Sequence, residues 1–166
     1  MRVVQASRWE WTVAGLGLVL IALLFAPWYG FENAGWTAYA PGNHVIPPNA
    51  SGWETGTVTS IVVAAFGMGC VAQAVVLRGV RGPATGLTWN VAIEWASIVV
   101  VVWIAIRAIW PPAQVGIGGQ FSEWGAWASL AVAVAVMIVN WLGMRDERTS
   151  RPRNREVPVR PIPPAA

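Results

Sequence analysis

Four polar side chains stand inside long apolar stretches, and they are the residues with which this chain could do chemistry. Glu94 and Asn90 share one apolar run, while Gln73 and Asn140 stand in two others. Glu94 lies about 7 residues into its run, which places it about 10 Å deep in a helix that rises 1.5 Å per residue. Asn90 is one turn earlier on the same helix face. From depth alone, all four side chains are expected in one layer, which forms the candidate intramembrane polar site.

This polar layer has two interpretations. An ionisable group at such depth is costly in lipid, so Glu94 must face the bundle interior or a water pocket. In a functional reading, Glu94 is a proton or cation site. In a structural reading, Asn and Gln side chains hydrogen-bond the carboxyl group and fix the helix packing, with bonds that average about 0.6 kcal/mol in membrane bundles. The clasp is the preferred interpretation, and the proton or cation site stays open.

Arg107 is the second charge in the run that holds Glu94. It follows Glu94 by 13 residues, which is about 20 Å along the axis and nearly opposite around the helix. The two charges therefore cannot pair within this helix. Near the outer surface Arg107 can snorkel, and we expect it to anchor an outer loop by pairing with Glu54, Glu123 or Glu32.

Composition places the chain in a membrane. Of its 166 residues 55% are apolar and only 11% are charged, against about 25% charged in soluble domains. There is no Lys, one Cys and one His, which removes Schiff-base chemistry, an internal disulfide and a bis-His haem. We find no Ser/His/Asp set, metal-ligand cluster or nucleotide loop. We therefore expect no enzyme, no cofactor, no metal site and no nucleic-acid partner.

Four apolar runs are long enough to cross a bilayer, which needs about 20 residues each. The predicted fold class is all-α, a four-transmembrane-helix bundle with helices at about 11–28, 57–77, 87–110 and 124–144. The first run resembles a signal peptide but lacks a small-x-small cleavage site, so an uncleaved span is expected. Seven of the twelve Trp residues fall near these helix ends, as in an aromatic belt. The bundle should comprise residues 1–146, followed by a tail at 147–166.

Arginine placement predicts the orientation. If four spans are correct, ten of the eleven Arg residues lie on one side, and the positive-inside rule makes that side cytoplasmic. Both termini should then be cytoplasmic in a multi-pass protein of the cell membrane. The first outer loop, 29–56, is long and extracytoplasmic. The Arg/Pro-rich tail should be disordered and bind anionic lipid, although "PVRPIPP" would also suit a docking peptide.

Several short motifs mark the predicted helix ends. "APWYG" closes the first helix, "SGWE" precedes the second, "PP" ends the third and "MRDE" ends the fourth. In this pattern the chain resembles uncharacterised small four-span integral membrane proteins of actinobacteria, over roughly residues 10–147. The resemblance implies a four-span fold, and it carries over no activity and no functional residues.

Two classes of function fit these features. The first is a non-enzymatic accessory or scaffold subunit of the cell envelope that presents its outer loop to a partner, which the length and aromatic content of that loop favour. The alternative is a small oligomeric proton- or cation-coupled transporter or channel that uses Glu94. Besides the lipid bilayer, both a membrane-protein partner and a homo-oligomer fit, and the sequence leaves that choice open.

Overall fold

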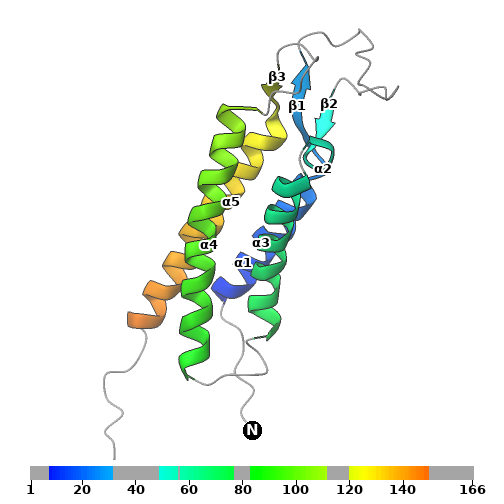
Figure 1. Cartoon of the computed structure of the whole chain (residues 1–166). Coiled ribbons are helices and arrows are strands. Elements are labelled where there is room, and N and C mark those ends of the chain that lie inside the picture. Colours follow the sequence, from blue (N-terminus) through cyan, green and yellow to red (C-terminus); the bar gives the residue numbers. More distant parts are fainter. Residues whose placement is uncertain (1–7, 32–48, 56, 77–82, 112–119, 150–166) are drawn as a thin grey trace, which may run out of the picture.

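The computed structural model describes residues 8–31, 49–55, 57–76, 83–111 and 120–149. Helices dominate these residues, and three short strands join them at one end (Figure 1). In chain order the elements are α1 Arg8–Leu23, β1 Pro27–Phe31, β2 Asn49–Ser51, α2 Gly52–Thr55, α3 Thr57–Val76, α4 Pro83–Ile109, β3 Gln120–Ser122 and α5 Trp124–Thr149.

The four long helices run alternately up and down (Figure 1). Helix α1 packs against α3 and α5, and α4 packs against α5 and α3, so the helices form a closed ring of neighbours. Helix α1 begins and α5 ends at the same end of the bundle, here called the termini end, and the strands occupy the other, here called the sheet end. The prediction of a helical bundle is confirmed at this coarse level.

Among the residues that the structure describes, three helices are long and apolar enough to cross a membrane. These spans are Val58–Val75, Thr88–Ile109 and Trp124–Asp146, within α3, α4 and α5. Helix α1 has only 16 residues, about 24 Å at 1.5 Å per residue. Hydrogen bonds of the tighter i to i−3 type continue its path through Ala26.

The first helix ends earlier than its apolar run predicts. Helix α1 stops at Leu23, and residues of the expected helix 11–28 pass into strand β1. Two local causes coincide. Pro27 disfavours helical backbone at the residue before it, and the Trp28 indole N–H donates to the Leu23 carbonyl at 2.8 Å. The Leu23 carbonyl at the helix end thus accepts two hydrogen bonds, from the Trp28 indole and from the Ala26 backbone N–H.

The last helix extends past the predicted boundary between bundle and tail. Helix α5 continues to Thr149, whereas the expected helix ended at 144 and the expected bundle at 146. Residues 150–166, on which the tail predictions depend, lie outside the described residues.

A three-stranded antiparallel sheet corrects the all-α expectation. Its strand order is β2-β1-β3, and β1 pairs with segments from both outer connections. Gly30 lies opposite Asn49 on one side and Phe121 on the other. The strands are only three to five residues long. Pairing joins residues about 20 positions apart between β1 and β2 and about 90 apart between β1 and β3, so no local sequence pattern predicts the sheet.

Large apolar side chains lie outside and several polar side chains lie inside, which is the reverse of the arrangement in a soluble protein. Large apolar side chains such as Met68 and Val99, 61% and 62% exposed, cover the outside of the helices. The buried polar residues are Glu10, Thr59, Ser60, Gln73, Asn90, Ser97, Ser129 and Asn140. An apolar surface of this extent is unsuited to water and suits lipid.

Exposed tryptophans mark two levels along the helices. On α4, Trp89 and Trp110 are about 21 residues apart, roughly 32 Å along the axis. On α5, Trp124 and Trp141 are about 17 residues apart, roughly 26 Å. Both distances are close to the hydrocarbon thickness of about 30 Å, so these side chains are placed like aromatic belts.

Helices α1 and α3 approach each other most closely at two glycines. A Cβ added to Gly17 would meet the Cys70 Cβ at 2.7 Å and the Gly67 carbonyl oxygen at 2.8 Å. A Cβ added to Gly67 would meet the Gly17 carbonyl oxygen at 2.7 Å. Only glycine allows the backbones this contact, as at the small-residue interfaces of membrane helices.

This close contact predicts that alanine substitution has opposite effects on bundle stability at Gly17 and Gly15 of α1. Gly17→Ala should destabilise the bundle by about 1–3 kcal/mol because of overpacking, partly offset by the higher helix propensity of alanine. Gly15→Ala is the matched control, because a Cβ at Gly15 meets nothing within 4 Å, and it should be neutral or stabilise by up to about 1 kcal/mol. Unfolding of the purified proteins in detergent, followed by tryptophan fluorescence, measures both, and equal midpoints would contradict the close contact.

Candidate functional site: a polar cluster at the termini end

Hydrogen bonds join the four sequence-predicted polar residues into one cluster across three helices. The Asn140 amide N–H groups donate to the Asn90 carbonyl at 3.1 Å and to Glu94 Oε2 at 2.9 Å. The Gln73 amide N–H donates to Asn90 Oδ1. The cluster therefore contains Gln73 of α3, Asn90 and Glu94 of α4, and Asn140 of α5.

The elements bring these residues to one level because the helices alternate in direction. Gln73 is close to the end of α3, whereas Asn90 and Glu94 are in the first half of α4. Asn140 lies in the last third of α5. Gln73, Asn90 and Asn140 are buried and Glu94 is partly exposed. A single side chain, Asn140, thus fixes α5 against two successive turns of α4.

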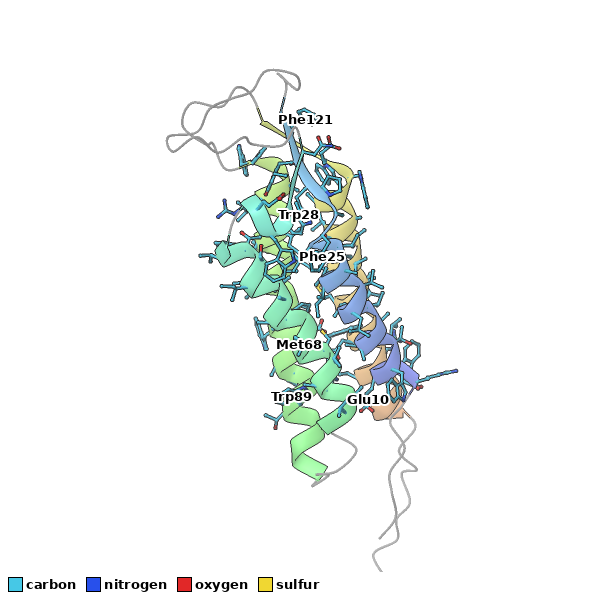
Figure 2. All side chains as sticks on the ribbon, turned by 90° about the vertical axis from the view of Figure 1, so that its right-hand side faces the viewer. Glu10, Phe25, Trp28, Met68, Trp89 and Phe121 are labelled. Carbon is cyan, nitrogen blue, oxygen red and sulfur yellow. The ribbon has the colours of Figure 1, made fainter. Side chains whose placement is uncertain are left out.

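A second carboxyl group, that of Glu10, lies at the same end, and the sequence analysis did not include it in the candidate site. Glu10, in the first turn of α1, is 5% exposed, and Figure 2 shows it at the termini end. Its neighbour Trp9 donates its indole N–H to Asp146 at 3.0 Å, and the Trp9 side chain packs over Gly143. These contacts fold the end of α5 over the start of α1. Glu10 is thus buried because α1 and α5 pair. The position of Glu10 in its apolar run does not reveal that pairing.

A small cavity opens among these groups. It is lined by Trp9, Glu10, Val13, Gln73, Asn90, Asn140, Gly143 and Met144, and its volume is about 10 Å³. That is close to the smallest space that holds one water molecule. Gln73 is one of the lining residues, and its side-chain oxygen Oε1 is buried without a hydrogen-bond partner. A buried acceptor in that state costs about 1–3 kcal/mol.

Arg107 has a different partner from those expected. Its guanidinium lies over the Trp103 ring, 5.3 Å from the ring centre, in a cation–π geometry. Within the described residues it forms no ion pair with Glu54 or Glu123. Glu54 accepts hydrogen bonds from the backbone N–H and hydroxyl of Ser51 at 2.8 and 3.0 Å. Glu32 lies outside the described residues.

The outer segments are nevertheless joined to the end of α4, through backbone carbonyls. The Tyr29 hydroxyl donates to the Arg107 carbonyl at 3.3 Å, and the Ser122 hydroxyl donates to the Ala108 carbonyl at 2.5 Å. Burial raises the pKa of the Tyr29 phenol, and the nearby Arg107 charge opposes that rise. The phenol therefore remains a donor at neutral pH. These bonds satisfy carbonyls that the last turn of α4 leaves open.

Comparison with family models, with curated proteins and with solved structures finds no match for this chain. The arrangement of the cluster is therefore the basis for its chemistry. The Asn140 amide N–H holds one carboxylate, Glu94, while Glu10 and Gln73 are among the residues that line the cavity. Among the residues that the structure describes, no three His, Cys, Asp or Glu side chains gather as metal ligands. The cluster can therefore lock α3, α4 and α5 together.

The hydrogen bond between Asn140 and Glu94 predicts that substitutions of its two partners lower the stability of the bundle by different amounts. Glu94→Gln keeps an acceptor for Asn140, so its cost should stay near the average of about 0.6 kcal/mol for one such bond. Asn140→Leu leaves Glu94 and the Asn90 carbonyl without their donor, and should cost about 1–3 kcal/mol. Denaturant unfolding in detergent compares the two variants. A Glu94→Gln protein that is less stable than Asn140→Leu would contradict the assignment of Asn140 as the joining side chain.

Proposed function

We propose that this chain is a non-enzymatic integral membrane protein of the cell envelope, an accessory or scaffold subunit that presents its sheet end to a partner protein. The observation that carries the proposal is the construction of that end. Tyr29 and Ser122 donate to the last turn of α4, and the Ser60 hydroxyl donates to the Gly52 carbonyl at 2.5 Å. Segments from both outer connections are thereby attached to helices α3 and α4.

Attachment of the sheet end to the helices suits recognition of a partner protein rather than transport of a solute. Beyond the polar cluster, the large apolar side chains of Leu20, Val63, Ile104 and Val136 fill the bundle core and are fully buried. The buried polar residues in this part of the core are hydroxyl residues, namely Thr59, Ser60, Ser97 and Ser129. The four large apolar side chains come from all four long helices and lie between the polar cluster and the sheet end. A solute crossing the bundle would have to displace them, whereas a partner at the sheet end would meet a surface held in place by hydrogen bonds.

The proposed topology has four spans, with both termini in the cytoplasm and the sheet end outside. Helix α1 supports this because its path to Ala26 covers about 19 residues, roughly 28 Å. Its outward face is also apolar, with Leu18 and Phe25 57% and 71% exposed. Ten of the eleven arginines fall toward the termini end in sequence, as the positive-inside rule requires for a cytoplasmic face.

Cysteine labelling tests this topology. The native Cys70 is buried, and Cys70→Ser gives a background without thiols. On that background, a membrane-impermeant maleimide should label Asn49→Cys on intact cells and Arg148→Cys only after lysis. The reverse pattern, or labelling of both positions on intact cells, would contradict the proposed orientation.

A paired substitution at the sheet end tests the scaffold role. Tyr29→Phe combined with Ser122→Ala removes two hydroxyl donors, each worth about 0.5–1.5 kcal/mol, while the termini end stays intact. We expect a several-fold lower recovery of a cross-linked envelope partner from native membranes, measured by quantitative affinity purification. Glu94→Gln is the control and should leave recovery unchanged. Equal recovery from the wild type and the paired variant would contradict a partner at this end.

The alternative is a small proton- or cation-coupled transporter, and the two carboxyl groups at the termini end favour it. On that view Glu94 exchanges its bond to Asn140 for a proton or cation during each cycle. Flux in proteoliposomes that Glu94→Gln abolishes, without loss of bundle stability, would establish transport and displace the scaffold proposal. Absence of flux together with stoichiometric partner recovery is the outcome that the scaffold proposal expects.

A further inference from the structure

Arg107 carries the one charge of α4 near the sheet end, and its side chain turns back along the helix. The guanidinium lies over the Trp103 ring, 5.3 Å from the ring centre, and Trp103 is about one turn earlier in α4. This direction follows from the tilt of Cα–Cβ bonds toward the N-terminus of a helix. The charge is therefore held roughly 6 Å back from the level of the Arg107 backbone, and it does not extend past the end of α4.

The start of α3 fixes the level of this charge in the bundle. The Trp103 indole N–H donates to the Thr59 hydroxyl at 3.3 Å, and the apolar span of α3 begins at Val58. Helix α4 continues to Ile109, which is about six residues, roughly 9 Å, past Trp103. The guanidinium is thus level with the point where α3 enters the apolar layer. Beside α3, that level is where lipid headgroups meet acyl chains.

The guanidinium keeps its hydrogen-bond donors free for a ligand. It presents five N–H donors in a planar fork, and a ring face occupies none of them as a conventional acceptor. Among the residues that the structure describes, Arg107 contacts the Trp103 ring, and its guanidinium makes no ion pair or hydrogen bond. A phosphate group has the charge and the paired oxygens that match this fork in a two-pronged contact.

The surface next to Arg107 distinguishes a lipid from a free anion. Val99, Val102 and Ile106 are 62%, 52% and 47% exposed, and their spacing of three and four residues places them on one face of α4. Ile106 is the neighbour of Arg107 in the chain, so this apolar stripe runs from the charge toward the middle of the bundle. A charge at headgroup level with an apolar stripe beneath it matches a molecule that has a phosphate and acyl chains.

We propose that Arg107 and the stripe Val99, Val102 and Ile106 form a binding site for one phospholipid of the leaflet at the sheet end. The guanidinium, held in position by the Trp103 ring, donates to two oxygens of the lipid phosphate. One acyl chain lies along the stripe. The inference requires that the bundle lies in a membrane, and it does not depend on a partner protein at the sheet end.

The test measures lipid binding to the purified full-length protein in detergent. Native mass spectrometry counts the bound molecules when phosphatidylglycerol, diacylglycerol with the same acyl chains, or inorganic phosphate is added. Phosphatidylglycerol should bind at one molecule per chain more tightly than diacylglycerol, and millimolar inorganic phosphate should not displace it. Phosphatidylglycerol with a photoactivatable acyl chain should form adducts on residues 99–106, which peptide mapping locates.

Two substitutions of Arg107 and one matched control assign the site. Arg107→Gln removes the charge and should lower the yield of adducts on residues 99–106 about tenfold. Arg107→Lys keeps the charge without the fork and should give an intermediate yield. Arg8→Gln is the control, because the Arg8 guanidinium also lies over a ring, that of Trp9, at 5.2 Å, but at the termini end. It should leave the adducts on residues 99–106 unchanged.

The substitution of Arg107 should not prevent folding. Tyr29 bonds to the backbone carbonyl of Arg107, which every variant retains. Adducts are compared on protein that elutes as a single folded species, so a lower stability of the variant does not alter the interpretation.

Four results would overturn the proposal. Equal yields of adducts from wild type and Arg107→Gln would show that the charge does not hold the lipid. Equal binding of diacylglycerol would assign the site to the apolar stripe alone. Displacement of the lipid by inorganic phosphate would make the site one for a free anion. Glu32→Gln that lowers the unfolding midpoint as much as Arg107→Gln, with adducts unchanged in both, would assign Arg107 to an outer carboxylate. All four leave recovery of an envelope partner as a separate measurement, so the scaffold proposal stands or fails independently.

Discussion

The bundle depends on contacts that do not need the hydrophobic effect. Lipid is as apolar as the side chains it touches, so helices associate there through close packing and interhelical hydrogen bonds. The chain uses both, in different places. Gly17 and Gly67 bring the backbones of α1 and α3 into contact, and Asn140 joins α5 to α4. The inward placement of polar residues and the apolar outer surface follow from the same constraint.

The helix ends are held by different kinds of hydrogen bond at the two ends of the bundle. At the sheet end, hydroxyl and indole donors of Trp28, Tyr29 and Ser122 satisfy carbonyls at the ends of α1 and α4. At the termini end, side chains of different helices bond to one another, as Trp9 does with Asp146. One end is therefore fixed by capping from outer segments, and the other by contacts between helices.

Apolar run length sufficed to predict α3, α4 and α5, because a membrane-length run has few alternatives to a helix. Depth along each run also placed Gln73, Asn90, Glu94 and Asn140 at one level, since antiparallel helices of similar length bring equal depths together. What depth could not reveal is which way a side chain faces. Arg107 was therefore assigned to carboxylates of the outer segments, whereas in the structure its guanidinium lies over Trp103 of its own helix.

For the same reason, the sequence did not predict pairing between distant segments. Strand β1 lies in a stretch that reads as the end of an apolar helix, and only its neighbours β2 and β3 make it a strand. Small residues recur along the second run, at Ser60, Ala64, Ala65, Gly67 and Gly69. The backbone of α3 contacts α1 at Gly67, and this position depends on the rotation of both helices, which composition does not reveal.

The four helix–helix interfaces of the ring differ in how closely the helices pack. Helices α3 and α4 share the smallest of the four helix–helix interfaces. Two side-chain hydrogen bonds cross this interface, from Trp103 to Thr59 at 3.3 Å toward the sheet end and from Gln73 to Asn90 toward the termini end. These two bonds supplement the sparser packing of α3 against α4, and the Asn140 bonds likewise join the more closely packed α4 and α5. Any motion that opened the bundle would begin here, because separating α3 from α4 exposes the least packed surface. Gln73 takes part in this interface through its bond to Asn90 and also lines the cavity, so a substitution at Gln73 would affect both features at once.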